Sequence, residues 1–168
     1  IYGLTGTTNY EDLAKILIGV YESSVDIPNG LVIGMVFIIA ALLFKATAAP
    51  FHMWAPDVYE GSPTIVSTFF AVVPKIAILG LFTRLLMYSF HDLMDSWQVV
   101  ILLSAIMSMV IAAFTALTQR KIKRFLAYSS IGHVGYLLIG LGTGTVEGVQ
   151  GLFVYTLIYV IMTLNAWT

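Results

Sequence analysis

Two lysines and one histidine lie inside apolar stretches of the chain, where an ionisable side chain is costly. Lys45 follows fourteen apolar or glycine residues, 31–44, and Lys75 lies about twelve residues into the next apolar stretch. A charge at the centre of a bilayer costs at least ~2.5–3.5 kcal/mol on insertion scales. His133, in "YSSIGHVGY", has a side chain that exchanges a proton near neutral pH. Ionisable side chains at membrane depth predict a functional role for these residues.

Prolines next to both lysines strengthen this prediction. At ~1.5 Å per residue, Lys45 lies ~20 Å along its helix, near the middle of a ~30 Å hydrocarbon core. Lys75 reaches a similar depth from the opposite side. Pro50 and Pro74 each remove a backbone donor and clash with a carbonyl one turn back, so helix breaks are expected at both prolines. Interrupted helices beside ionisable groups form the ion sites of many transporters. Snorkelling of the lysines and simple packing kinks are the alternatives.

Small polar side chains recur on the helices that would surround these groups. They are spaced at about one helical turn and could line a hydrated path. Hydrogen bonding between helices is the alternative for His133, and close helix packing is the alternative for the hydroxyl groups. The candidates are Ser104, Ser108, Thr115, Ser129, Ser130 and Tyr136.

The elements that carry these groups are predicted to be membrane-spanning helices. The chain has 168 residues, of which 59% are hydrophobic and 10% are charged. Its apolar runs recur at the spacing of serial bilayer-spanning helices, which predicts an all-α polytopic membrane protein with a single transmembrane region. The five predicted segments cover about 31–45, 63–90, 97–118, 125–142 and 149–167. The chain has no cysteine, which excludes disulfides, thiolate metal sites and Fe–S ligation in this chain.

One basic loop predicts the orientation. "QRKIKR" places Arg120, Lys121, Lys123 and Arg124 between the third and fourth segments, and the positive-inside rule puts such a loop on the cytoplasmic or matrix side. Alternation then puts "DVYEG" on that side, and residues 7–30 and "HDLMDS" on the outer side. Topology alone explains the basic loop; binding of acidic lipid or a partner subunit is the alternative. With basic residues confined to one loop, nucleic-acid binding is not expected.

Further expectations concern the residues outside the five segments and the acidic residues that the segments lack. Residues 1–6 are expected to end an earlier helix, and residues 11–23 to form an amphipathic helix on the membrane surface or a connector helix. The chain begins with Ile1 and ends in an apolar run, which suggests a piece of a longer or split polypeptide. No Asp or Glu lies in the middle of any segment. Because charge at depth is usually paired, a carboxylate for Lys45 is expected from sequence outside this chain.

Three stretches together carry a family resemblance. "LLFKATAAPFHMWAPDVYEGSP", "PKIA" and "IKRFLAYSSIGHVGY" resemble the subunit 2 family of respiratory NADH:ubiquinone oxidoreductase, complex I, an antiporter-like proton-pumping subunit. The resemblance is strong over residues 31–142. It implies a fourteen-helix fold with two inverted five-helix repeats. Residues 31–90 would then hold the last two helices of the first repeat, and residues 97–168 the first three helices of the second.

The resemblance also implies roles and partners. Lys45 would be the lysine on the broken helix that pairs with a glutamate from an earlier helix, and Lys75 and His133 would continue a central hydrophilic axis. NADH, FMN, Fe–S clusters and ubiquinone would bind elsewhere in the complex, and this chain would hold no cofactor or metal. Other membrane-arm subunits and lipid would surround it. The mitochondrial inner membrane is favoured over a bacterial plasma membrane. A cation/proton antiporter or hydrogenase subunit, or a non-conducting scaffold, are the competing functions.

Overall fold

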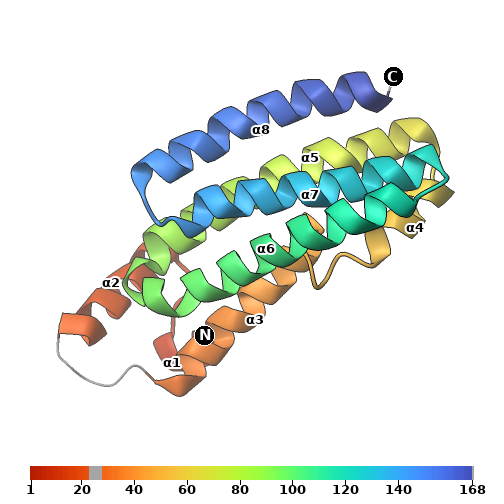
Figure 1. The fold of residues 1–168 in the computed structure, drawn as a ribbon. Coiled ribbons are helices and arrows are strands. Elements are labelled where there is room, and N and C mark those ends of the chain that lie inside the picture. Colours follow the sequence, from red (N-terminus) through yellow and green to blue (C-terminus); the bar gives the residue numbers. More distant parts are fainter. Residues whose placement is uncertain (23–27, 168) are drawn as a thin grey trace.

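The computed structural model describes residues 1–22 and 28–167 as a bundle of helices (Figure 1). The part of the chain that the structure describes contains no β-strand. Five of its helical stretches are long and apolar enough to cross a membrane, which confirms the all-α membrane fold and the five predicted spans. They cover Asn29–Ala46, Thr64–Ser89, His91–Thr118, Ile122–Gly142 and Val146–Trp167.

The helices follow one another with short connections. A π-helical turn, Leu85–Ser89, continues α5, and a 3₁₀ turn, His91–Leu93, leads into α6. The α-helices are α1 (Tyr2–Thr5), α2 (Tyr10–Glu22), α3 (Asn29–Ala46), α4 (Trp54–Gly61), α5 (Thr64–Arg84), α6 (Met94–Thr118), α7 (Ile122–Gly142) and α8 (Val146–Trp167).

The spanning helices lie roughly along one direction, with α3 on one side of the bundle and α8 on the opposite side (Figure 1). The short helices α1 and α2 gather at one end, and α4 lies at the other end against α5 and α7. α2 confirms the predicted helix near the N-terminus and buries Leu13, Ala14 and Leu17. Residues 23–27 of the predicted outer stretch 7–30 lie outside the described residues.

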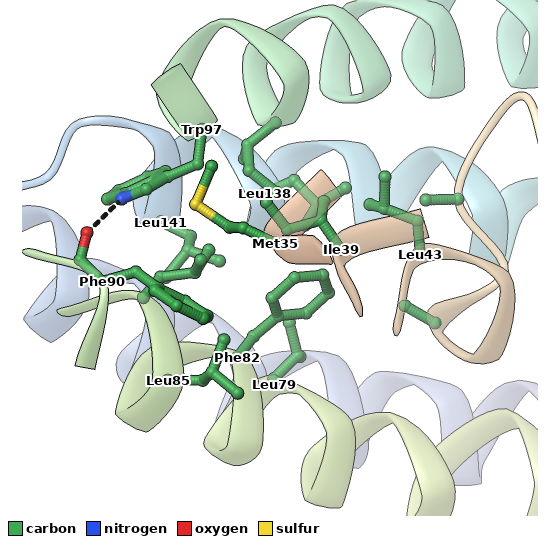
Figure 2. Close-up of a cluster of buried hydrophobic side chains, with 14 of the residues drawn as sticks. Met35, Ile39, Leu43, Leu79, Phe82, Leu85, Phe90, Trp97, Leu138 and Leu141 are labelled. Atoms are coloured by element: carbon green, nitrogen blue, oxygen red, sulfur yellow. Dashed lines mark hydrogen bonds between the residues drawn. The ribbon is translucent and has the colours of Figure 1, made fainter. Parts of the chain in front are cut away.

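A hydrophobic cluster holds α3, α5, α6 and α7 together (Figure 2). α3 contributes a stripe of buried residues at helical spacing, which includes Met35, Ile39 and Leu43. At the end of the cluster, the Trp97 indole donates a hydrogen bond of 2.9 Å to the Phe90 carbonyl, so that the polar edge of the ring is satisfied within the apolar core.

α6 and α7 approach each other closely where Gly135 faces α6. A Cβ atom at Gly135 would lie 2.7 Å from the Met109 Cγ atom and 2.9 Å from the Ala105 carbonyl oxygen. The backbone atom cannot move aside without shifting α6, so only glycine fits here. The close approach fixes α7, which carries Ser130 and His133, against α6.

The chain leaves helical geometry between α3 and α4. α3 ends at Ala46, Thr47 adopts a left-handed conformation with φ 66°, and α4 begins only at Trp54. Pro50 lies inside this non-helical stretch, 47–53, which we call the break. Its ring would clash with the Ala46 carbonyl if the helix continued.

The break expected at Pro74 is wrong, because α5 runs through Pro74 as a continuous α-helix. Pro74 has no N–H to offer the Phe70 carbonyl, one turn back. The Tyr59 hydroxyl donates to that carbonyl instead, at 3.2 Å. The carbonyl of the next residue, Ala71, accepts a hydrogen bond of 2.9 Å from the Tyr159 hydroxyl. α4 thus supplies the donor that Pro74 lacks, and α5 remains a continuous helix.

Candidate functional site

The break lies beside the middle of the longest spanning helix. The Ala49 N–H donates to the Ser108 hydroxyl at 2.8 Å, and the Ser104 hydroxyl donates to the Ala49 carbonyl at 2.5 Å. Ser104 and Ser108 are buried near the centre of α6. Because non-helical backbone at membrane depth must be satisfied by protein or water, these two hydroxyls explain how the break is tolerated.

Two further polar atoms in the break have no hydrogen-bond partner among the described residues. They are the Thr47 Oγ1 and His52 Nδ1 atoms, and both side chains are buried. Buried polar atoms of this kind are ordinarily satisfied by ordered water or by another chain. Sequence reasoning did not select either residue.

Lys45 is exposed in the last turn of α3, immediately before the break. The buried stripe of α3 includes Leu43, and two residues along a helix turn a side chain by about 200°. Lys45 therefore lies off the face that packs into the bundle. The expectation of a buried lysine axis does not hold for Lys45 within this chain, and the ion pairs of the described residues do not include it.

Lys75 differs, since its side chain is 2% exposed. It lies near the middle of α5 and donates a hydrogen bond to the Ser130 hydroxyl of α7. Ser130 and the Tyr159 hydroxyl of α8 share a hydrogen bond of 2.6 Å, and the Lys75 Nζ atom lies 5.8 Å from the centre of the Tyr159 ring. With the Ala71 carbonyl at its far end, this forms a chain of hydrogen bonds across three helices.

His133 stands beside this chain of hydrogen bonds. Its Nδ1 atom shares a hydrogen bond of 2.8 Å with the Tyr155 hydroxyl, and its ring lies 5.4 Å from the Tyr159 ring between centres. The Tyr136 ring is 6.4 Å from that of His133 and 6.1 Å from that of Tyr155. The structure thus brings Lys75, Ser130 and His133 into one polar region of the bundle.

Two surface grooves reach this polar region. A groove of about 120 Å³ between α7 and α8 is lined by Ser129, Ser130, His133 and Tyr159, among others. A second groove, of about 220 Å³, runs between α6 and α7 and includes Ser129, His133 and Tyr136. Tyr136 is 54% exposed. Thr115 lies apart from this region along α6 and donates to the Ile111 carbonyl of its own helix.

The basic loop forms ion pairs with α4. Lys121 pairs with Glu60, and Arg124 pairs with Asp57 and, at 3.3 Å, with Glu60. The hydrogen bond from the Lys121 ammonium holds the pKa of the Glu60 carboxyl below its usual value. "DVYEG" and "QRKIKR" therefore lie at the same end of the bundle, as the alternation of spans requires.

The remaining basic residues of that loop differ in their contacts. The Lys123 ammonium donates to the Ser62 carbonyl at 2.7 Å, and so adds a third link between α7 and the end of α4. Arg120 is exposed and makes no ion pair within the described part of the chain.

Sequence reasoning missed the three tyrosines that complete the site. Tyr155 and Tyr159 stand four residues apart in an apolar segment, a spacing that places both hydroxyls on one face of a helix. That signal was available in the sequence. Tyr59 belongs to the recognised "DVYEG" stretch, but its bond to the Phe70 carbonyl depends on the fold. Across residues 1–22 and 28–167, no three His, Asp or Glu side chains gather as a metal site.

A bundle of membrane-length helices, with a break against the middle of α6 and a lysine of α5 enclosed against α7 and α8, defines a polytopic membrane protein with an ionisable core. The family model described as "NADH:quinone oxidoreductase/Mrp antiporter, TM" matches residues 1–168. The chain belongs to this family.

Within this family, the chain is similar to proteins named as subunits or chains of NADH-quinone and NADH-ubiquinone oxidoreductases. The chain is 54% identical to NADH-ubiquinone oxidoreductase chain 2 of Marchantia polymorpha over 99% of its length, and 54% identical to NADH-quinone oxidoreductase subunit N of Rhodospirillum rubrum over all of it. It is 47% identical to NADH-ubiquinone oxidoreductase chain 2 of Arabidopsis thaliana over 99% of its length. The chain spans about a third of the length of each relative, 34%, 34% and 33%.

Proposed function

We propose that this chain is the central part of a proton-translocating subunit of an NADH:quinone oxidoreductase. The single observation that carries the proposal is Lys75, which is enclosed in the middle of three spanning helices and hydrogen-bonded to a hydroxyl group. A cation at membrane depth is costly to keep and is ordinarily tied to ion or proton movement. The names of the relatives supply the reaction to which that movement would be coupled.

In this proposal Lys75 and Lys45 both hold protons, but by different means. Lys75 is supported by Ser130 within the chain. Lys45 is exposed beside the break, and we propose that it pairs with a glutamate from an adjacent helix outside this chain. A carboxylate within ~4–6 Å would favour the charged lysine, and its withdrawal would favour proton release.

The wider assembly is also part of the proposal. The exposed apolar faces of the spanning helices would contact lipid, other helices of the same subunit and other membrane subunits. The boundary between two inverted repeats would fall at residues 91–96, with His133 and the hydroxyl groups of the grooves on a hydrated path. NADH, flavin, Fe–S clusters and quinone would bind elsewhere in the complex. The membrane would be the mitochondrial inner membrane, or the plasma membrane in a bacterium.

The test uses the full-length subunit in the intact complex, in sealed membrane vesicles. Lys75→Ala and Lys45→Ala should each lower proton pumping per NADH oxidised, while NADH oxidation by an artificial acceptor stays near the parent level. Arg120→Ala is the matched control, because it removes an exposed cation that makes no ion pair in the described part of the chain. Normal pumping per NADH in both lysine variants would overturn the proposal.

The family description also names Mrp antiporters, which favours cation/proton exchange as a second candidate. The same vesicles separate the two functions. Proton movement that requires Na⁺ or K⁺ in the assay and persists without NADH would support exchange. Movement that requires NADH and ignores the cation would support the oxidoreductase.

A further inference from the structure

The hydrogen bonds around Lys75 have a direction that follows from the number of protons available. A protonated lysine can only donate, so the Ser130 oxygen accepts from it. The Ser130 proton must then go to the Tyr159 oxygen, 2.6 Å away, and the single Tyr159 proton goes to the Ala71 carbonyl, 2.9 Å away. In this arrangement the Ser130 and Tyr159 hydroxyls each have one proton and one acceptor, and no oxygen has to donate twice.

The same groups can be arranged in the opposite sense when Lys75 is neutral. A neutral amine has a lone pair, to which Ser130 can donate, and Tyr159 can then turn its proton from Ala71 to Ser130. The hydroxyl of Tyr159 has therefore two acceptors within hydrogen-bond distance and one proton to give. The second arrangement holds one proton fewer, the one that leaves Lys75; the two hydroxyl groups keep their protons and only change the direction in which they donate.

The acceptor at the end of the chain of hydrogen bonds, the Ala71 carbonyl, lies next to the carbonyl that Pro74 leaves free. Pro74 leaves the Phe70 carbonyl without its helical donor, and the hydroxyls of Tyr59 and Tyr159 are bonded to the adjacent carbonyls of Phe70 and Ala71. Tyr159 is buried at 2% exposure, so water does not compete freely for its proton. Its ring also faces the Lys75 ammonium, which is a favourable position for a cation.

We propose that Tyr159 is a positioning residue for Lys75: through Ser130, its hydroxyl supports the proton-carrying lysine and reverses direction when the proton leaves. This inference rests on the proposed function and adds a residue of α8 to it. Tyr159 itself neither gains nor loses a proton in this role. Of the described residues, the Tyr159 ring of α8 faces Lys75, and Tyr59 of α4 and His133 of α7 lie close enough to interact with it electrostatically.

The experiment compares Tyr159→Phe with Tyr155→Phe in the full-length subunit within the intact complex. Tyr159→Phe keeps the ring over Lys75 and removes only the hydroxyl. Tyr155 lies one turn away on α8 and bonds to His133 instead of Ser130, so its variant controls for effects transmitted through His133. The measurement is proton pumping per NADH oxidised as a function of pH.

The alkaline limb of the pumping profile should move to lower pH by about 0.5–1 pH unit in Tyr159→Phe, the size expected from the loss of one hydrogen bond. Pumping per NADH at the acidic plateau should stay at the parent value, and Tyr155→Phe should leave the limb in place. A Tyr159→Phe profile that superimposes on the parent profile, or an equal shift in Tyr155→Phe, would overturn the inference.

Two further variants keep the inference testable if Tyr159→Phe does not accumulate. Ser130→Ala removes the link between Lys75 and Tyr159, whereas Ser130→Thr keeps a hydroxyl at that place. The inference requires the alkaline limb to move to lower pH in Ser130→Ala and to return toward its parent position in Ser130→Thr. Identical pH profiles for these two variants would contradict it. Lys75→Ala distinguishes failure of the proposed function from failure of this inference. Normal pumping in Lys75→Ala would overturn both. Lost pumping in Lys75→Ala, together with an alkaline limb that does not move in Tyr159→Phe, would overturn only the inference.

Discussion

The surroundings of Lys45 and Lys75 show two ways in which a membrane bundle carries a cation. Lys75 is enclosed; its hydrogen-bond partner is Ser130 of α7, which is itself bonded to the Tyr159 hydroxyl of α8. Lys45 is exposed at the end of α3, beside a break that the chain stabilises only in part. Both lysines follow long apolar runs, so the sequence around them looks alike. The difference comes from what packs against each helix.

The two sites therefore differ in which atoms can change position. At Lys75, the chain fixes the side chain and leaves hydroxyl protons free to turn. At Lys45, the chain fixes the backbone of the break through Ser104 and Ser108, and leaves the lysine open to whatever lies outside. A switch at Lys45 would therefore depend on a neighbouring helix, whereas Lys75 can respond through atoms of this chain alone.

The largest effect is expected from removing the hydroxyl groups that support the break. Ser104→Ala with Ser108→Ala leaves the Ala49 N–H and C=O without partners, at about 1–3 kcal/mol for each buried group. The melting temperature of the purified protein in detergent should fall clearly. Thr115→Val is the control, because the Thr115 hydroxyl bonds within its own helix and supports no break. Equal losses in both proteins would show that the break does not depend on these serines.

Replacing each lysine with arginine tests whether Lys75 is buried and Lys45 exposed, because a larger side chain should destabilise only the buried site. Lys75→Arg places a larger, planar group in a buried site, and overpacking of this kind costs typically ~1–3 kcal/mol. Lys45→Arg adds the same atoms to an exposed side chain and should leave stability unchanged. The measurement is again thermal melting in detergent. A larger loss in Lys45→Arg would mean that Lys45 is the more tightly enclosed of the two.

A smaller effect is expected at Tyr59, which connects the two regions because α4 follows the break and its tyrosine bonds to α5. Tyr59→Phe leaves the Phe70 carbonyl, freed by Pro74, without a donor, and a single hydrogen bond contributes about 0.5–1.5 kcal/mol. Tyr136→Phe is the control, since Tyr136 is more than half exposed. If both variants melt alike, α5 does not need Tyr59 to remain continuous through Pro74.

The spans could be predicted from the sequence because a membrane-spanning helix needs a long apolar run, which is visible without the structure. The sequence also placed Lys75, Ser130 and His133 in candidate positions, and the fold brings them together. It could not predict that α5 passes through Pro74, since the donor that replaces the missing N–H is the Tyr59 hydroxyl, which reaches the Phe70 carbonyl only because the fold packs α4 against α5. Nor could it tell that Lys45 is exposed, because the packing face of α3 is set by Met35, Ile39 and Leu43.

The smallest effect is expected at the end of the bundle, where α4 is tied to α7 by exposed charges. The Lys121 ammonium lowers the pKa of the Glu60 carboxyl, so this pair stabilises the fold above the unfolded carboxyl pKa of about 4.3 and loses its contribution as pH falls through the lower folded pKa. Glu60→Gln should thus melt slightly below the parent at pH 7 and together with it near pH 3.

Exposed pairs are also screened by salt, so the small difference at pH 7 should shrink further at about 1 M ionic strength. Arg120→Gln is the matched control, because Arg120 belongs to the same loop and makes no ion pair in the described part of the chain. A Glu60→Gln loss as large as that of the Ser104 and Ser108 double variant, or one that grows as the pH falls, would show that α4 is held by its charged end rather than by the hydroxyl groups at the break.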